Sequence, residues 1–102
     1  MLLETTKENN TITSIYESSN IFKSRYFSSN NELHITFNNG NVYKYNNVDI
    51  PTFLKLQEAQ SIGKFFASEI KPKFQFEKIG SEDPKIIIED IKKLKSKMGF
   101  SD

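Results

Sequence analysis

Hydrophobic and polar residues alternate along the first half of the chain with a period of two, which is typical of β-strands that bury one face. The alternation is weak in the short segment 11–16. It is clearer in three segments rich in aromatic and β-branched residues, 21–27, 33–37 and 42–45. Turn-forming sequences, SSNNE and NNGN, separate the last three. The pattern predicts consecutive antiparallel strands and one more short strand at 73–79, whereas residues 1–10 show no period and are expected to form a loose arm.

The turn around Gly40 determines how two of these strands pair. A two-residue loop would set Ile35 opposite Lys44 and place a lysine on the apolar face. A three-residue loop, 38–40, sets Ile35 opposite Tyr43 and gives Gly40 the left-handed position that suits a glycine. Because a slip of one residue turns every side chain to the other face, we choose the three-residue loop.

This register divides the predicted sheet into an apolar face and a mostly basic face. The apolar face contains Phe22, Tyr26, Leu33, Ile35, Phe37, Tyr43 and Tyr45, and the basic face contains Lys23, Arg25, His34, Thr36, Val42 and Lys44. We expect Tyr43 and Tyr45 to pack against a helix at 50–60, with their hydroxyls on polar partners.

Helical periodicity follows residue 48. Asp49 suits a helix N-cap, and Pro51 falls in the first turn, where its missing N–H costs nothing. After a break, a second short helix turns Phe65, Phe66 and Ile70 toward the core and ends at Pro72.

A longer helix is predicted from the cap residue Asp83 to Gly99, with one apolar stripe of Ile87, Ile91, Leu94 and Met98. Its three consecutive isoleucines, 86–88, make the apolar arc wider than one packing seam needs. We therefore expect this helix to cover the core or to contact another copy in a homo-oligomer.

Together these elements predict a single α+β domain with a small twisted antiparallel sheet of three to five strands, helices packed on one side and a C-terminal amphipathic helix. The expected divisions are an N-terminal arm with a short strand at 1–18, a domain at 19–79 and a helical extension at 80–102.

Composition narrows the function further. The 102 residues contain no cysteine, which excludes disulfides and thiolate chemistry, and the net charge of +1 provides no general attraction to nucleic acid. Any anion site must therefore be local. The start of the chain lacks the pattern of a signal peptide, and no segment is apolar enough to span a membrane, so we expect a cytoplasmic location in a bacterial cell or a phage-infected host.

The span from Ser19 to Phe74 resembles the KTSC domain, a small module named for the C-terminus of some lysyl-tRNA synthetases and also found as stand-alone proteins in bacteria and phages. The resemblance is carried by Ser19-Asn20-Ile21, Tyr26, Leu33-x-Ile35-x-Phe37-x-x-Gly40-x-x-Tyr43-x-Tyr45-x-x-Val48, Phe53, Leu56, Ala59, Ser61-x-Gly63-Lys64-Phe65-Phe66, Ile70-Lys71 and Phe74. It implies a small twisted antiparallel sheet with helices on one side. It implies tRNA contact only through association with the synthetase, because a fold does not determine a function.

Four positions depart from the family pattern. Asp49 stands where a proline is usual, Ala67 where an asparagine often follows the phenylalanine pair, Phe74 where a tyrosine closes the motif, and Ser24 at an apolar position. The changes at 67 and 74 remove polar groups near the Ser-Gly-Lys stretch, which argues against an elaborate hydrogen-bonding site there.

The first candidate site is Ser61, Gly63 and Lys64 at the start of the second helix, where free backbone N–H groups and a lysine favour an anion. It is not a P-loop, because the preceding glycine and the four-residue spacing are missing. Lys71 and Lys73 lie at the far end, so they reach the same anion only if the helix is short or a second subunit brings its copy alongside. The alternative is a serine cap and a helix break with solvated lysines.

The second candidate is the basic sheet face, where Lys23, Arg25 and Lys44 would extend the contact or hold a second phosphate. Basic sheets with aromatic side chains receive single strands in many small modules. The alternative is a solvated face, or one covered by the C-terminal helix.

Metal and catalytic sites are not expected. His34 is the single histidine and has no cysteine or second histidine to complete a metal site. No nucleophile and base lie visibly together, which argues against an enzyme, and no cofactor is predicted. We therefore expect a non-enzymatic binding module for a phosphate-bearing ligand, either single-stranded RNA or a nucleotide, and as a phage protein it would sequester a host nucleotide signal. The alternative is a protein–protein adaptor that uses the isoleucine-rich helix.

Overall fold

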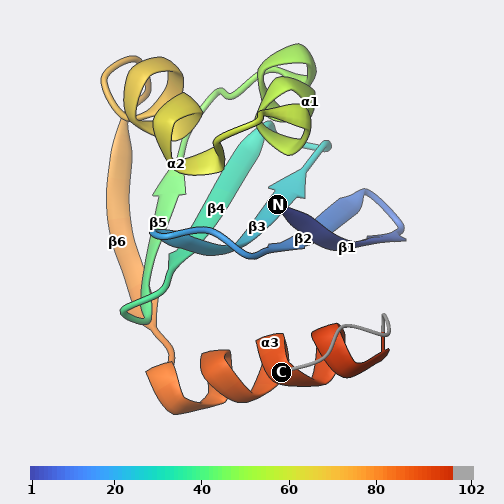
Figure 1. Ribbon diagram of the computed structural model, residues 1–102. Coiled ribbons are helices and arrows are strands. Elements are labelled where there is room, and N and C mark those ends of the chain that lie inside the picture. Colours follow the sequence, from blue (N-terminus) through green and yellow to red (C-terminus); the bar gives the residue numbers. More distant parts are fainter. Residues whose placement is uncertain (98–102) are drawn as a thin grey trace.

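The computed structural model describes residues 1–97 and contains one antiparallel sheet of six strands, which lie side by side in chain order (Figure 1). The strands are β1 (Leu2–Glu8), β2 (Thr11–Tyr16), β3 (Ile21–Phe27), β4 (Glu32–Phe37), β5 (Asn41–Tyr45) and β6 (Phe76–Ser81). The helices are α1 (Ile50–Glu58), α2 (Ile62–Phe65), its π-helical continuation η1 (Phe66–Ile70) and α3 (Pro84–Lys97). The α+β class is confirmed, but the prediction of three to five strands was too low.

The strand that the sequence pattern missed is β1, in the segment expected to be a loose arm. It pairs with β2 through a hairpin in which Asn9 takes a φ of 56°, a left-handed conformation that asparagine tolerates. Leu3 is the one buried residue of β1. Because an edge strand exposes most of its residues, its sequence carries little of the alternation that reveals a strand.

The register around Gly40 is the predicted one. Ile35 pairs with Tyr43 and Leu33 with Tyr45, and Gly40 has a φ of 96°. The predicted basic face also forms. Across β3, β4 and β5 its residues are paired as Lys23–Thr36–Val42 and Arg25–His34–Lys44.

Phe22 departs from the predicted face because of a β-bulge. Ile21 pairs with Phe37 and Lys23 with Thr36, so Phe22 is the extra residue that shifts the alternation. Ile21 therefore joins the main core in place of Phe22. The Phe22 ring is buried outside that core, and its centroid lies 5.6 Å from the ammonium of Lys23, a residue of the basic face.

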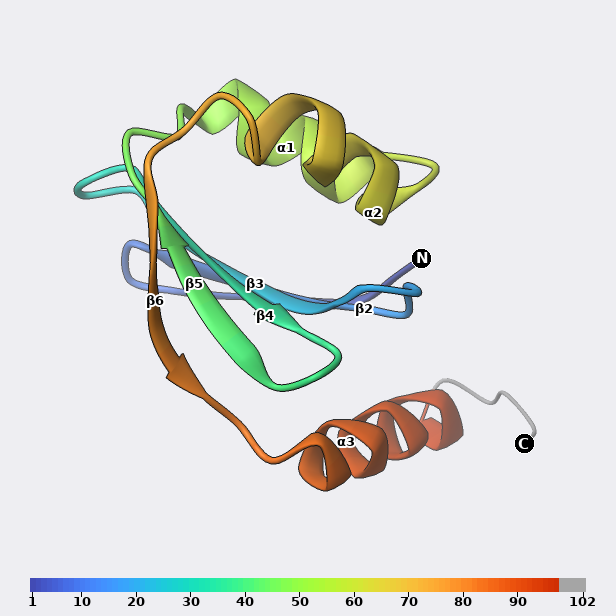
Figure 2. The same ribbon diagram turned by 90° about the vertical axis from the view of Figure 1, so that its left-hand side faces the viewer.

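Helices α1 and α2 with η1 cover one face of the sheet and close the main core (Figure 2). Phe53 of α1 stacks on Tyr26 of β3, with ring centroids 4.6 Å apart. Phe66 and Ile70 of η1 are buried, as predicted, and Phe65 is partly buried against the core. Asp49 occupies the N-cap of α1, although its carboxylate accepts the Thr52 hydroxyl rather than a backbone N–H.

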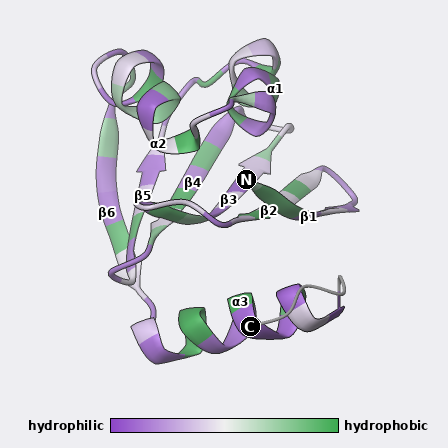
Figure 3. Cartoon of the chain, viewed as in Figure 1, coloured by the Kyte–Doolittle hydropathy of each residue, from purple (hydrophilic) through white to green (hydrophobic). Residues whose placement is uncertain are grey.

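The C-terminal helix α3 lies on the other side of the sheet from α1 and α2 (Figure 2). Ile87 is buried there, whereas Ile86 and Ile88 are exposed, and hydrophobic and hydrophilic segments alternate along the helix (Figure 3). Ion pairs join Lys95 to Glu17 and Lys97 to Glu4. The helix thus covers part of the second face of the sheet. Met98 and Gly99, the predicted end of its stripe and its stop, lie outside the described residues.

Among residues 1–97, no helix has both the length and the apolar character needed to cross a membrane.

Candidate functional site

A groove opens on the helix side of the sheet, between η1 and the end of β4. It consists of two adjoining cavities of about 450 Å³ and about 390 Å³ that share Phe37, Asn39, Phe66 and Lys71. We call the first cavity the polar end, because Ser19, Asn20, Asn38, Gly63 and Ala67 complete its lining. We call the second the aromatic end, completed by Asn41, Tyr43, Tyr45 and Phe76. The two volumes are in the range of small-molecule sites.

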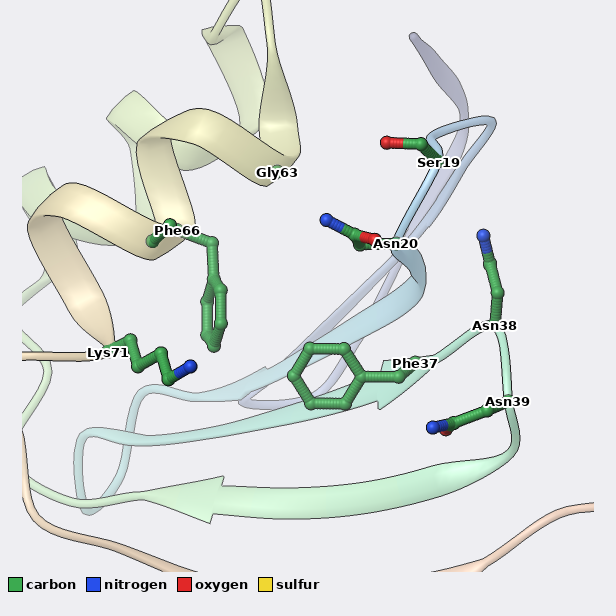
Figure 4. A pocket seen from close by; sticks show the side chains of 9 residues that line it. Ser19, Asn20, Phe37, Asn38, Asn39, Gly63, Phe66 and Lys71 are labelled. Carbon is green, nitrogen blue, oxygen red and sulfur yellow. The ribbon is translucent and has the colours of Figure 1, made fainter.

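The polar end is assembled by two turns that face the helix. Two hydrogen bonds join these turns. The Asn38 backbone N–H donates to the Asn20 carbonyl at 2.8 Å, and the Asn38 side-chain amide donates to the Ser18 carbonyl at 2.7 Å. Figure 4 shows the side chains of Ser19 and Asn20 directed toward the helix that carries Gly63 and Phe66. The result is a rim of hydroxyl and amide groups that both donate and accept hydrogen bonds.

Gly63 permits this close approach of helix and turn. A β-carbon at Gly63 would lie 3.3 Å from the Asn20 amide nitrogen, which is tighter than ordinary van der Waals contact. The sequence pattern suggested that Gly63 offers backbone N–H groups to an anion. The structure shows a second use for this glycine, which is to keep the polar end of the groove open beside Asn20.

Asn38 has an acceptor, unpaired within residues 1–97, that is buried beside this end. Its amide nitrogen faces the Ser18 carbonyl, so the orientation of the amide group is fixed by hydrogen bonding. Its Oδ1 is buried and has no hydrogen-bond partner among the described residues. Buried acceptors are nearly always paired. Because this oxygen is buried, it lies behind the lining of the groove and is not itself a contact for a ligand there.

Lys71 supplies the positive charge of the groove. It follows η1 directly, lines both ends, and extends its ammonium toward Phe37 (Figure 4). Its ammonium makes no ion pair with any residue among 1–97, and it is the one charged side chain among the described residues that line the groove. An anionic group placed at the centre of the groove would therefore meet an uncompensated charge.

Aromatic rings form the walls on either side of Lys71. Phe37 and Phe66 contact each other edge to face at 5.4 Å, and Tyr45 meets Phe66 in the same way at 5.4 Å. Tyr45 is buried in the same core cluster as Phe53 of α1, as expected, and its aromatic contacts are with Phe66 and Phe76. The expected polar partner of its hydroxyl is not found among the described residues. Tyr45 is buried, which raises the pKa of its phenol to about 12 with a smaller contribution from the Tyr43 phenol, whereas Tyr43 is only half-buried.

The other residues of the predicted helix site do not enter the groove. Ser61 caps α2, where its hydroxyl accepts the Lys64 backbone N–H at 3.3 Å, and Lys64 is exposed outside the groove. Lys73 pairs with Glu69 at 3.0 Å. Gly63 and Lys71 do line one cavity, and both come from the same chain because α2 and η1 together are short. No second subunit is needed to bring these two residues together.

The basic sheet face forms but is largely neutralised. Glu82 pairs with Lys23 at 3.3 Å, Glu77 with Lys44 at 2.9 Å, and Glu32 with His34 at 3.2 Å. Glu77 also raises the pKa of Lys44 by hydrogen bonding and by its charge. Arg25 is the basic residue of this face without an ion pair among the described residues, and it lines a shallow cavity beside Thr13 and Glu8. These carboxylates weaken the interpretation of the face as a phosphate track.

Within the described part of the chain, no three histidine, aspartate or glutamate side chains gather closely enough to hold a metal ion.

An open antiparallel sheet with a helix-bounded groove on one face defines a small α+β domain, and sequence comparison places it in a family. Residues 17–74 match the KTSC domain, and because this span exceeds half of the chain, the protein belongs to the KTSC domain family. The crystal structure of a KTSC domain protein from Yersinia pestis is similar, with 34% identity and a TM-score of 0.64 over 67% of this chain and 96% of that chain. No curated protein matches the chain.

Sequence reasoning found Gly63 and Lys71 but missed the rest of the groove. Asn38 and Asn39 were interpreted only as turn residues, and Asn20 only as part of the family resemblance. No local signal in the sequence indicated that these asparagines line a groove. Every lining residue except Phe76 lies within the family span of 17–74.

Proposed function

We propose that this protein is a non-enzymatic binding module for a phosphate-bearing ligand, either a nucleotide or a nucleotide of single-stranded RNA. The observation that carries the proposal is the position of Lys71, which lies where the polar and aromatic ends of the groove meet. A lysine binds phosphate as a compact positive charge. Amide groups and aromatic rings on either side suit the polar sugar and the flat base of a nucleotide.

The shape of the groove favours a single nucleotide over a long strand. A protein that binds single strands without sequence preference usually provides a charged track with several stacking residues. Here the opposite face of the sheet is neutralised by Glu32, Glu77 and Glu82, and the groove is a compact concave site. This arrangement supports a single nucleotide as the ligand. The more specific proposal, that the protein is a phage product and sequesters a host nucleotide signal, needs such a single-nucleotide site.

The proposal is non-enzymatic because of the chemistry of the lining. Among the described residues, the groove is lined by amides, one serine, aromatic rings and one lysine, without a carboxylate or an imidazole. General acid–base catalysis at neutral pH usually uses those two groups. Binding without turnover is the function that this lining supports best.

The test is isothermal titration with the four nucleoside monophosphates and with a short single-stranded RNA, using the parent protein, Lys71→Ala and the control Lys64→Ala. Lys64 is exposed on the same helical segment but lies outside the groove. We expect Lys71→Ala to lower affinity about tenfold or more, because a charge-assisted hydrogen bond contributes about 1.5–3 kcal/mol. Lys64→Ala should change it less than about twofold. Equal affinities for the parent and Lys71→Ala, or binding of none of these ligands by the parent, would refute the proposal.

A specific observation also supports a second candidate, a protein–protein adaptor or homo-oligomer that uses α3. Ile86 and Ile88 are 52% and 55% exposed, and Ile88 lines a shallow cavity with Ile91. An amphipathic helix with an exposed apolar strip is a common partner surface. Sedimentation equilibrium of the parent and of Ile88→Asp tests the oligomer: a parent that is monomeric at high concentration argues against it.

A further inference from the structure

Phe76 is a large apolar residue at the groove that remains open to solvent. Its side chain is 53% exposed although it lies at the aromatic end, with ring centroids 5.9 Å from Tyr43 and 5.6 Å from Tyr45. Both neighbouring rings are tilted relative to Phe76, by 50° and 33°, so the three rings do not stack on one another as a closed cluster. All three residues line a cavity of about 390 Å³.

We propose that Phe76 and Tyr43 hold the flat heteroaromatic ring of the ligand, with its phosphate at Lys71. This inference rests on the proposed function and deepens it, because it assigns the ligand to nucleotides whose base contributes to affinity. Stacking of a base on an aromatic side chain stabilises binding regardless of the base, since each base has a π-face. Lys71 lines the same cavity, so ring and phosphate occupy one continuous site.

A polar group at the rim of the aromatic end orients the ring. The Asn39 Oδ1 atom accepts the Asn41 backbone N–H at 3.0 Å, which leaves the Asn39 amide nitrogen as the group available to a ligand. Figure 4 shows the Asn39 side chain directed toward Phe37, which lines both ends of the groove. A donor at this position matches a carbonyl oxygen or an unprotonated ring nitrogen on the edge of a base.

The base-binding end depends on a strand outside the family match. Pairing of β6 with β5 sets Phe76 opposite Tyr45, and β6 follows the family span of 17–74. The polar end and Lys71 lie within that span. The family span therefore supplies the site for the phosphate and one of the two rings for the base, Tyr43, whereas the strand that follows it supplies the other, Phe76.

The experiment compares ligands with and without a base. Isothermal titration would use the four nucleoside monophosphates, ribose 5-phosphate and inorganic phosphate on the parent, Phe76→Ala and the control Ile79→Ala. Ile79 is an exposed apolar residue of the same strand, 44% accessible, and does not line the groove. We expect at least one nucleotide to bind the parent about tenfold more tightly than ribose 5-phosphate, since base stacking on an aromatic ring contributes about 1–3 kcal/mol.

The two variants separate stacking from general damage. Phe76→Ala should reduce the nucleotide affinity to that of ribose 5-phosphate and leave the ribose 5-phosphate affinity unchanged, whereas Ile79→Ala should alter neither. Phe76→Trp provides a second readout, because the chain has no tryptophan and the introduced indole fluorescence should be quenched by the nucleotide but not by ribose 5-phosphate.

The outcomes distinguish this inference from the proposed function. One outcome is that ribose 5-phosphate binds the parent but not Lys71→Ala, and that every nucleotide binds the parent no more tightly than ribose 5-phosphate. The phosphate site then stands and the base contact is overturned. Equal weakening of both ligand types by Phe76→Ala would also overturn it, because that pattern indicates a structural role. If no phosphate ligand binds the parent, both proposals fail.

Discussion

The backbone N–H of Glu82 donates a 2.7 Å hydrogen bond to the carbonyl oxygen of Gly40. This bond joins the β4–β5 turn, which borders the groove, to the segment that leads from β6 into α3. The Glu82 carboxylate adds an ion pair with Lys23 at 3.3 Å and accepts the Thr36 hydroxyl at 3.3 Å. Glu82 therefore links the turn, the second face of the sheet and the start of the C-terminal helix.

Gly40→Ala should strongly destabilise the protein. The residue has a φ of 96°, and an added β-carbon would collide with the carbonyl oxygen of Glu82, which is backbone and cannot rotate away. We expect a loss of about 2 kcal/mol or more in the free energy of unfolding, measured by urea denaturation. Gly80→Ala is the matched control, because nothing lies within 4 Å of its added β-carbon, and it should change stability by less than about 0.5 kcal/mol. Similar losses for both variants would contradict the role assigned to the Gly40–Glu82 contact.

Ile87 should hold α3 on the sheet. It is 2% exposed, whereas its neighbour Ile88 is 55% exposed, so the pair tests burial within one helix. Ile87→Ala should lower the free energy of unfolding by about 2–5 kcal/mol if the protein unfolds as one unit, and Ile88→Ala by far less. Amide hydrogen exchange locates the effect: α3 amides should lose protection first in Ile87→Ala. Unchanged α3 protection in that variant would show that the ion pairs at Glu4 and Glu17 hold the helix instead.

The hairpin around Gly40 shows what the sequence could predict. Loop length, the glycine position and the apolar alternation agreed on one register, and that register is the observed one. Phe22 shows the limit, because the bulge beside it depends on pairing with β4 and leaves no mark on local periodicity. The edge strand β1 was missed for a related reason, since its one buried residue, Leu3, gives no repeat.

The groove was predictable only in part because its residues meet through tertiary packing. Lys71 was a candidate from its position after a helix, but nothing local indicates that Asn20 and Asn38 lie across from it. On the basic sheet face, by contrast, the residues were grouped correctly but the net charge was not predicted. Register alone grouped its cations correctly, but two of the carboxylates that neutralise them, Glu77 and Glu82, come from β6 and the segment after it.

Cations of the sheet face should contribute little to ligand binding. Lys23→Ala and Lys44→Ala remove charges that Glu82 and Glu77 already compensate, and both lysines lie on the opposite face of the sheet from the groove. We therefore expect nucleotide affinity within about twofold of the parent. Arg25→Ala serves as the comparison, since Arg25 has no ion pair among the described residues. The measurement is fluorescence anisotropy of a labelled nucleotide at two salt concentrations. A large loss of affinity in Lys23→Ala or Lys44→Ala would move the ligand to this face.

Stability should fall steeply in alkaline solution because of buried phenols. Burial raises the pKa of Tyr45 to about 12, with a smaller contribution from Tyr43, and burial also raises the pKa of Tyr16 and of Tyr26 above 10. The unfolded chain therefore loses these protons near pH 10, whereas the folded protein keeps them to higher pH. Over that interval the folded state binds more protons than the unfolded state, so the free energy of unfolding decreases as pH rises from about 10 toward about 12.

Tyr45→Phe isolates the contribution of one phenol to this decrease. The Tyr45 hydroxyl makes no hydrogen bond among the described residues, so a phenylalanine should keep the packing of the ring against Phe66. Urea unfolding of the parent and the variant across this pH range is the measurement, with tyrosinate absorbance as an independent record of ionisation. At neutral pH the two proteins should be similarly stable, and above about pH 10 the stability of Tyr45→Phe should fall less steeply. Parallel curves for the two proteins would mean that Tyr45 ionises equally in the folded and unfolded states, contrary to its burial at the aromatic end of the groove.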